Sequence, residues 1–305
     1  MLSVSVVIPA YREEKNIRAI LEDVCSQKTQ SFSLKEIVVI ADGSPETVAE
    51  GSKILDDRLK ITNYSSRHGK AYLLNMFHPT CTSDITVLLD ADIRLSHSGV
   101  LEALIAPFQK DPNLAATCGQ SIHIDPKTRV ESIAAAGIDM LEKTKQDLGE
   151  KALRYRFNGK ILAIRTQALA GLVIPGDVAT DTFTFYYLIS KSHKITFIPQ
   201  AEVFYKLPQK MSEYINQTKR YLKTNCHRYF DRKLLKQYET ITFSQKFRAL
   251  VRYGQHQPVL SLSFGCVYCI AKFRSFFYTR RAKWDMSETT KFSFNVAKKT
   301  SFERA

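Results

Sequence analysis

Over its first 95 residues the chain alternates between short apolar runs and longer amphipathic stretches. The apolar runs are rich in β-branched residues and have the length of buried strands, whereas the stretches between them have helical periodicity. This alternation is typical of βαβ units around a mostly parallel sheet. We therefore predict strands at 4–9, 35–40, 59–63 and 85–90, and helices at 13–26, 45–55 and 69–77.

Beyond residue 95 the same reading predicts fewer strands and more helices. It gives a helix at 130–148, a turn and strand at 155–165, a strand at 195–205 and helix-like segments at 211–238, 243–253 and 259–278. Pro199 within its strand indicates an edge or a bulge. No segment is expected to reach the roughly 18 to 20 apolar residues that cross a bilayer. The pattern predicts an α/β domain with a mostly parallel central sheet over residues 1–225 and a mainly helical region over 226–305.

The strand predicted at 85–90 ends in two carboxylates one residue apart, Asp90 and Asp92. Open α/β sheets bind ligands beyond the carboxyl ends of their strands, so both acids are expected to face a ligand crevice. Two hard oxygen donors can hold Mg²⁺ or Mn²⁺, which completes its shell with water and substrate phosphates. This indicates a nucleotide diphosphate as ligand. The alternative is that the two acids are solvated at the end of the strand and bind no metal.

Polar residues also follow the neighbouring strands. Asp42 follows the strand at 35–40, where it could accept a hydrogen bond from the imide of uracil or from a ribose hydroxyl, or simply form a turn before Gly43. Arg67 and Lys70 flank the predicted start of a helix, which favours a phosphate, although ordinary surface charge would look the same.

A further acid is predicted at the start of a helix near residue 180. Thr180 is a plausible N-cap, which would put Asp181 in the first turn, ionised and able to accept a proton. The alternative is a helix-capping acid without a chemical role.

The formal net charge of +14 comes from the last third of the chain. Residues 206–305 contain 21 Lys and Arg against 6 Asp and Glu, whereas residues 1–205 contain 23 against 24. Such a region suggests an anionic partner, namely a membrane surface, nucleic acid or a polyanionic acceptor, or else a solvated basic face. Scattered cysteines and a start without signal-peptide flanks favour a cytoplasmic protein with reduced thiols.

Taken in order, six stretches between residues 4 and 224 resemble the inverting glycosyltransferase family 2 with the GT-A fold, which contains the cellulose, chitin and hyaluronan synthases. They are VSVVIPAYREEKNI, EIVVIADGSPETV, RHGKAYLLN, LLDAD, GDVATDTFTFYYL and QTKRY. The last of these is similar to the QxxRW motif of the processive synthases, with Tyr221 in place of Trp.

The resemblance implies a GT-A fold and transfer of a sugar from a nucleotide-diphosphate sugar, with a UDP-sugar favoured, to an acceptor hydroxyl with inversion. It implies Mn²⁺ or Mg²⁺ as cofactor on Asp92, with Asp90 in the second shell of the ion or on the ribose, and Asp181 as general base. The residues it implies at the donor and acceptor are Pro9, Tyr11, Glu13, Asp42, Arg67, Lys70, Gln217, Arg220 and Tyr221. Among them, Lys70 and Arg220 would add positive charge at the leaving phosphates.

The chain departs from the synthases because their transmembrane helices are missing, which is consistent with adding one or a few sugars to a glycan or lipid-linked acceptor. Segment 272–284 interleaves aromatic residues with cations, as interfacial membrane helices do, although a basic helix packed on the catalytic domain would also fit. We expect a cytoplasmic protein, either free or peripheral on the inner face of the cell membrane, with an anionic membrane surface as the partner in the second case and no nucleic acid as partner.

Three other interpretations stay open at this point. A sugar nucleotidyltransferase would need a glycine-rich phosphate loop after the first strand, and residues 9–14 contain no glycine. A nucleic-acid-binding protein would use the basic third of the chain, with a steep dependence of binding on salt. A degenerate transferase would bind donor without turnover.

Overall fold

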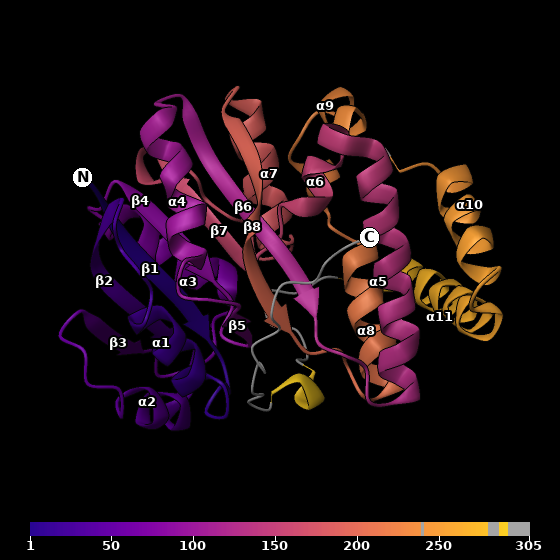
Figure 1. Cartoon of the computed structure of the whole chain (residues 1–305), viewed down its shortest axis with the longest axis horizontal. Helices are drawn as coiled ribbons and strands as arrows, with labels where there is room; N and C mark the ends of the chain where they lie inside the picture. Colours follow the sequence, from indigo (N-terminus) through magenta and orange to yellow (C-terminus); the bar gives the residue numbers. More distant parts are fainter. Residues whose placement is uncertain (239–240, 280–286, 292–305) are drawn as a thin grey trace.

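The computed structural model describes residues 1–238, 241–279 and 287–291, and its centre is a curled sheet of eight strands (Figure 1). The spatial order is β3-β2-β1-β4-β7-β6-β8-β5. The strands are β1 (Leu2–Ala10), β2 (Phe32–Ala41), β3 (Leu59–Asn63), β4 (Ile85–Leu89), β5 (Ile93–Leu95), β6 (Leu114–His123), β7 (Ile161–Arg165) and β8 (Lys194–Tyr205). The first four in space are mutually parallel, and β7 runs antiparallel to both β4 and β6.

The curl of the sheet follows from the position of β5. Only three residues separate β4 from β5, yet the two strands lie four places apart in the sheet. Four residues of chain span at most about 14 Å, whereas four strand spacings in a flat sheet would require about 19 Å. The sheet must therefore bend back on itself, and the connection Asp90-Ala91-Asp92 lies where the bend brings β4 and β5 together.

Helices cover both faces of the sheet and form a separate cluster at one end (Figure 1). They are α1 (Ile17–Cys25), α2 (Pro45–Gly51), α3 (Lys70–Phe77), α4 (Val100–Lys110), α5 (Arg129–Leu148), α6 (Leu153–Arg156), α7 (Thr180–Ser190), α8 (Met211–Leu222), α9 (Arg232–Tyr238), α10 (Phe243–Gly254) and α11 (Pro258–Phe276). In Figure 1, α10 and α11 lie at the opposite end of the molecule from β1, β2 and β3.

Two hydrophobic cores lie on opposite faces of the sheet because side chains alternate along each strand. Val6 and Ile8 of β1 pack with apolar residues of α1 and α4, whereas Val7 packs with those of α3 and α7. A third core joins α5, α8 and α11. There Gly137 of α5 lies so close to the ring of Phe264 of α11 that an added Cβ would overlap it.

The strands predicted in the first 95 residues are confirmed, with ends that shift by at most three residues. The helix expected from residue 13 begins only at Ile17, because residues 13–16 form a turn. Pro199 lies in a bulge of β8, as expected, at a register shift against Gly119. Strands β5 and β6 and helix α4 were not predicted from the sequence.

Two expectations about helices are wrong. Helix α7 has Ala179 as its N-cap and Thr180 as its first residue, so Thr180 does not cap it, although Asp181 is in the first turn as expected. Helix α11 has 19 residues and a mean hydropathy of 1.3, and it is long and apolar enough for a bilayer by length and composition. One such helix is weak evidence for a membrane-spanning segment, since core helices of soluble proteins meet the same criteria. In α11, 22% of the apolar stretch is buried inside the protein.

His78, directly after α3, gives a prediction about acid stability. It is 7% exposed, neither ring nitrogen has a hydrogen-bond partner within the described residues, and burial lowers its pKa from 6.5 to about 4. Because the unfolded chain takes up this proton at higher pH than the folded chain does, stability is lost as the pH falls from 6.5 towards 4. The free energy of unfolding, measured in urea titrations, should fall between pH 7 and pH 4 in both proteins. The fall should be smaller in His78→Leu than in the parent protein by roughly 3 kcal/mol. An equal loss in both proteins would contradict a buried neutral imidazole.

Candidate active site

Polar residues gather at the edge of the sheet where β1, β2 and β4 end. Because these strands are parallel, their carboxyl ends lie together, and the antiparallel strand β7 begins at the same edge. The backbone amide of Asp90 donates to the carbonyl oxygen of Lys160 at 3.2 Å, which joins the end of β4 to the start of β7. Strand β5, which follows the acid pair in the chain, is fixed to α1 by Arg94, whose guanidinium makes a bidentate ion pair with Asp23.

The acid pair is accompanied by a lysine and a third carboxylate. Lys70, the first residue of α3, donates to Oδ1 of Asp90. Burial opposes the charged form of Lys70, but the neighbouring carboxylates, Asp90 foremost, outweigh it and raise its pKa. The pKa of Asp92 is raised by burial and by the Asp90 carboxylate.

Glu13 is the third carboxylate, and the sequence did not place it beside the acid pair. It is 3% exposed and accepts a hydrogen bond from Nδ2 of Asn16 at 2.9 Å. Burial and then the Asp92 carboxylate raise the pKa of Glu13 to about 8, against the lowering effect of Lys291. Three carboxylates therefore crowd one poorly solvated volume, which favours a cation there.

The donor set fits a hard divalent cation that is shared with a substrate. Within the described residues no three His, Cys, Asp or Glu side chains converge as a closed metal site. Asp90 and Asp92 would thus supply at most two protein ligands, and an ion here must take the rest from phosphate and water. Burial first and the Asp90 carboxylate second raise the pKa of Asp92, and a divalent cation held by both acids would offset this effect.

Lys160 and Gly159 belong to the site and were missed in the sequence. The Nζ of Lys160 lies 4.2 Å from the ring centroid of Tyr205. Burial disfavours its charge, but Tyr221, Tyr205 and the acid pair raise its pKa above the ordinary value. The available signal was the polar turn before the apolar run of β7.

Asp181 faces the same space as the acid pair. Its Oδ1 accepts the backbone amide of Thr182 at 2.7 Å, and its Oδ2 accepts the amide of Gly159 at 3.3 Å. A Cβ added to Gly159 would lie 3.2 Å from Nζ of Lys70, 3.7 Å from Cβ of Asp181 and 4.0 Å from Oδ1 of Asp90. The absence of a side chain at residue 159 thus leaves room between the expected base and the expected metal ligands.

Asp42 is 3% exposed and organises a loop. Its two carboxylate oxygens accept the backbone amides of His68 and Gly69 at 2.6 and 2.8 Å. Gly43 has φ +70°, and a Cβ there would lie 2.9 Å from the carbonyl carbon of Ser66, so only glycine lets the two loops approach. The local Asx turn considered in the sequence is replaced by a contact between the loops after β2 and β3.

Tyr11 is surrounded by cations. The guanidinium of Arg67 lies 4.0 Å from its ring centroid and the Nζ of Lys291 lies 5.4 Å away. Pro9 pairs with Ile40 of β2, beyond the point where β1 pairs with β4, so its missing N–H breaks no ladder on that side.

Helix α8 carries Gln217, Arg220 and Tyr221. Gln217 and Tyr221 are four residues apart and share one side of the helix. Tyr221 is exposed and lies close enough to Lys160 to influence its charge, whereas Gln217 and Arg220 are half-buried. The structure therefore places Tyr221 near Lys160, and Gln217 and Arg220 lie on the same helix.

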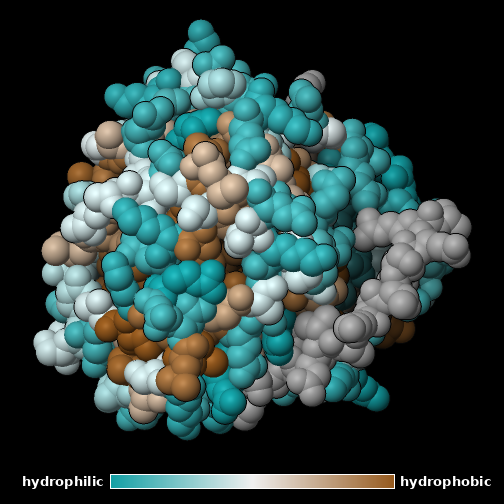
Figure 2. Space-filling view, turned by 60° about the vertical axis from the view of Figure 1, so that its left-hand side comes forward, coloured by the Kyte–Doolittle hydropathy of each residue, from teal (hydrophilic) through white to brown (hydrophobic). Residues whose placement is uncertain are grey.

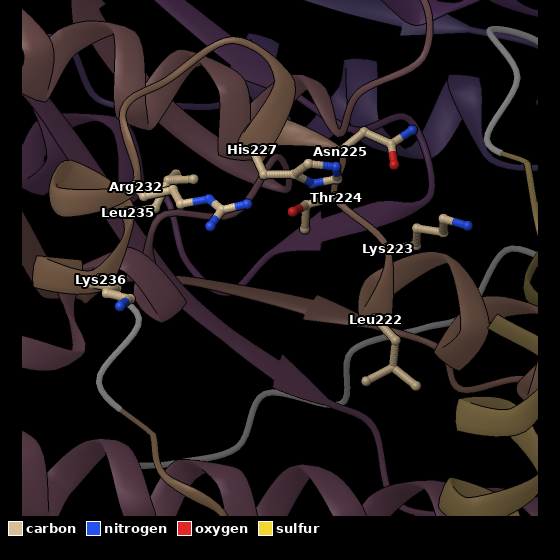
Figure 3. Close-up of a pocket in the computed structure, with 8 residues that line it drawn as sticks. All are labelled: Leu222, Lys223, Thr224, Asn225, His227, Arg232, Leu235 and Lys236. Atoms are coloured by element: carbon tan, nitrogen blue, oxygen red, sulfur yellow. The ribbon is translucent and has the colours of Figure 1, made fainter. Parts of the chain in front are cut away.

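A hollow of about 330 Å³ lies beside the segment that precedes Asp181 in the chain (Figure 3). Its wall is tied to the segment before Asp181, because the amide of Ala179 donates to the carbonyl of Thr224 at 3.4 Å. The lining residues are Leu222, Lys223, Thr224, Asn225, His227, Arg232, Leu235 and Lys236. A second hollow of about 570 Å³ lies at the amino end of β4, away from the acids.

Residues 5–171 match the family model described as glycosyl transferase family 2. The chain belongs to this family. The fold predicted from the sequence is thereby confirmed, and the sugar nucleotidyltransferase interpretation loses its support. The matched residues include the acid pair, Asp42 and Lys70, but end before Asp181.

Relatives of this family-2 chain align over part of its length. A 4,4'-diaponeurosporenoate glycosyltransferase of Staphylococcus haemolyticus is 27% identical over 126 residues, which are 40% of this chain and 32% of that protein. An undecaprenyl-phosphate 4-deoxy-4-formamido-L-arabinose transferase of Pseudomonas fluorescens is 24% identical, over 56% and 43%. A human dolichyl-phosphate beta-glucosyltransferase is 25% identical, over 41% and 42%. The matches span less than half the length of these relatives.

Solved structures share the fold. A mannosyltransferase from Pyrobaculum calidifontis, in complex with GDP-Man and Mn²⁺, superposes with a TM-score of 0.64 and 17% identity, over 90% of this chain and 87% of that one. GalNAc-T7 with UDP, GalNAc and Mn²⁺ gives 0.51 and 18%, over 68% and 43%. At these identities the likeness establishes the GT-A architecture alone.

Gly159 gives a prediction about the site. Gly159→Ala places a methyl group 3.2 Å from Nζ of Lys70, whose flexible end can move, so we expect the melting temperature to change by less than about 2 °C. Transfer should fall at least roughly tenfold, because a misplacement of about 1 Å disturbs a reacting geometry. Steady-state kinetics beside thermal unfolding measures this, and full activity would show that the space around residue 159 is not used.

Proposed function

We propose that this family-2 protein transfers a sugar from a nucleotide-diphosphate sugar to an acceptor, with inversion and with a divalent cation. The observation that carries the proposal is the arrangement around Gly159, where Asp90 and Lys70 border one side of a small space and Asp181 another. One side can hold a leaving diphosphate and the other can accept a proton, which is what a direct displacement requires.

The donor would lie along the edge formed by β1, β2 and β4. Asp42 is nearly buried and carries two backbone hydrogen bonds, and its oxygens keep further lone pairs for the imide N–H of a base. Uracil and guanine both carry such a group, whereas adenine and cytosine do not. A UDP-sugar remains the donor that we favour, and a GDP-sugar is the one to compare with it.

Lys70, Lys160 and the acid pair would manage the charge of the leaving group. Mn²⁺ or Mg²⁺ on Asp90 and Asp92 supplies positive charge at the diphosphate as the glycosidic bond breaks. The ammonium of Lys70 already contacts Asp90, and it would turn part of its hydrogen bonding to a phosphate oxygen when the donor binds. Arg220, on α8, is proposed to add to this field.

Asp181 is proposed as the general base. Its carboxylate is held by the amides of Thr182 and Gly159, so it is fixed in orientation before the acceptor arrives. It would remove the proton of the attacking hydroxyl as the new bond forms on the face opposite the diphosphate, which accounts for inversion. A positioned base contributes about 10²- to 10⁴-fold.

The hollow lined by residues 222–236 supports a lipid-linked acceptor with an acidic head group. Four of its lining residues are Lys, Arg or His, and leucines complete the wall (Figure 3). Lys223 donates to the carbonyl of Ser275 at 3.3 Å, which joins the rim to the end of α11. The relatives named above carry diaponeurosporenoate, undecaprenyl-phosphate and dolichyl-phosphate in their names. We extend this class of acceptor to the present protein, in glycolipid or cell-envelope polysaccharide synthesis.

The helices α10 and α11 support attachment to a membrane surface. On α10 the exposed apolar side chains recur every four residues, at Phe243, Phe247 and Val251. On α11 the exposed apolar side chains Val259, Leu262, Ile270 and Phe273 are spaced by three, eight and three residues, which puts them on one side of the helix. Lys246, Arg248 and Arg252 lie among them on α10. An apolar stripe flanked by cations suits an anionic interface. Figure 2 turns forward the side of the molecule opposite α10 and α11, and on that face hydrophilic residues prevail.

This attachment modifies the expectation from the sequence. The interfacial helix was expected at 272–284, but residues 280–284 lie outside the described part of the chain. Residues 272–276 form the last turns of α11, and the more amphipathic helix is α10. We propose peripheral attachment to the cytoplasmic leaflet through both helices.

A thermal-shift series with UDP-sugars and GDP-sugars, each with and without Mn²⁺, tests the donor site. The parent protein should be stabilised by one donor, and only with metal, because ligand binding to the folded state raises its stability. Asp92→Ala should abolish that shift, whereas Asp181→Asn should keep it and lose transfer by at least about 100-fold.

Undiminished turnover of Asp181→Asn would remove the base assignment, and binding without turnover in the parent protein would indicate a degenerate transferase. In the same assay a polyprenyl-diphosphate-linked sugar, which offers both an anionic head group and an attacking hydroxyl, should accept the sugar better than a neutral glycan. Arg232→Glu should raise the KM for that lipid. A preference for the neutral glycan would contradict the acceptor proposal.

Sedimentation with phosphatidylglycerol liposomes tests membrane attachment. We expect binding at low salt that weakens as salt screens the cations. Replacing both Phe243 and Phe247 with Ser should lower the partition coefficient by at least roughly tenfold, since each exposed ring would otherwise enter the interface.

The matched control for the liposome experiment replaces Leu55 and Val173 with Ser. These side chains are 97% and 70% exposed and lie on loops outside α10 and α11, so sedimentation should not change. Equal loss in both double variants would point to non-specific adsorption.

A further inference from the structure

The turn between β1 and α1, residues 10–13, carries Tyr11 and Glu13, and its backbone is completed by a residue near the other end of the chain. The amides of Arg12 and Glu13 donate to Oγ of Ser44 at 3.0 Å and to Oγ1 of Thr47 at 2.9 Å. These bonds fix one side of the turn onto the start of α2.

The carbonyl oxygens of the turn also accept hydrogen bonds. The carbonyl of Ala10 accepts the amide of Asp42, and the carbonyl of Glu13 accepts the amides that begin α1. The carbonyls of Tyr11 and Arg12 accept from Nζ of Lys291, at 2.8 and 3.0 Å. Within residues 1–238, 241–279 and 287–291 we see no other donor to these two oxygens.

Lys291 is built into this position. It is 5% exposed, and its Nζ lies 3.8 Å from Oε1 of Glu13, so the three hydrogens of the ammonium face three oxygens of one turn. The short segment Ser287–Lys291 is held on its other side by Thr289. That residue accepts the amide of Gln209 at 2.9 Å and donates to the carboxylate of Glu213 on α8. In Figure 1 this segment is the isolated yellow turn between α8 and the N-terminal half.

The turn needs such support because its backbone is not in a relaxed conformation. Arg12 has φ +54°, a left-handed value that non-glycine residues seldom adopt and that persists only where surrounding contacts maintain it. Lys291 binds the carbonyl of this very residue and of the one before it. Removing the ammonium leaves two carbonyl oxygens without a donor and Glu13 beside Asp90 and Asp92 without its nearest cation.

We propose that Lys291 is a positioning residue of the donor site, which completes the turn of residues 11–13 so that Tyr11 and Glu13 are held in place for the nucleotide. The role rests on the proposed function in so far as the ligand is a nucleotide. The C-terminal segment Ser287–Lys291 is then part of the donor site, although it lies about 200 residues beyond the acid pair. Lys291 acts through the turn and takes no part in bond making.

Hydrogen exchange of the ligand-free protein tests this inference without any substrate. In Lys291→Met we expect the amides of residues 12 and 13 to exchange at least roughly tenfold faster, because the turn loses the contacts that oppose its strain. Thr289→Val, which loosens the segment but keeps the lysine, should change the same amides in the same direction and to a smaller extent. In calorimetric titrations with UDP and with GDP, each with Mn²⁺, Lys291→Met should raise the Kd of whichever nucleotide the parent protein binds by at least about tenfold.

Lys145→Met is the matched control. Lys145 is also nearly buried and also pairs with a glutamate, Glu142, but it lies on α5, away from the turn. Its replacement should leave both the exchange of residues 12 and 13 and the nucleotide Kd unchanged. Parent-like exchange at the turn in Lys291→Met overturns the inference. If the parent protein binds neither nucleotide, the proposed function fails, and the exchange experiment still decides the role of Lys291.

Discussion

The structure is organised around the crowding of negative charge at one poorly solvated edge of the sheet. Glu13 lies near Asp90 and Asp92 there, and Asp181 lies across the space at Gly159. The pKa values of Glu13 and Asp92 are raised by burial first and by the neighbouring carboxylates second. Such a cluster is tolerable only if cations come close, because an unpaired buried charge is strongly unfavourable. Several structural elements near the site place lysines close to these acids.

Each lysine arrives by a different structural route. Lys70 is carried by the start of α3, whose preceding loop is fastened to Asp42. Lys160 is brought in by the reversed direction of β7, which begins where its parallel neighbours end. Lys291 comes from the far end of the chain and also completes a backbone turn. The three lysines thus lie around the acids that we propose to hold a divalent cation.

The basic last third of the chain contributes to separate regions of the molecule. Its helices α10 and α11 present apolar stripes and cations to the outside, at the end of the molecule far from β1, β2 and β3 (Figure 1). Its segment Ser287–Lys291 returns to the turn after β1. The hollow lined by residues 222–236 is tied to the end of α11 through Lys223, which donates to the carbonyl of Ser275. The last third of the chain therefore contributes to the exposed helices, to this hollow and to the first turn of the sheet.

The sequence by itself determined the parts that depend on neighbours along the chain. Alternating apolar runs specified β1 to β4 and their parallel order, the letters after β4 specified the acid pair, and Asp181 was placed correctly in a first helical turn. The motifs also gave the family. Thr180 was predicted as the N-cap of α7, which is Ala179, one residue earlier. The apolar stretch of α11 was predicted to be too short for a bilayer. Both errors arose because helix ends and bilayer criteria depend on small local differences.

Only the tertiary structure decided which distant groups share the site. The contacts of the site depend on how the sheet curls and on where the chain returns. They are those of Glu13 with Asp92, of Gly159 with Lys70 and Asp181, of Lys160 with Tyr205 and of Lys291 with the first turn. Periodicity constrains residues up to a few positions apart, whereas the balance of buried charge is set by groups that meet through space. For that reason the acids could be read from the sequence, and most of their counter-charges could not.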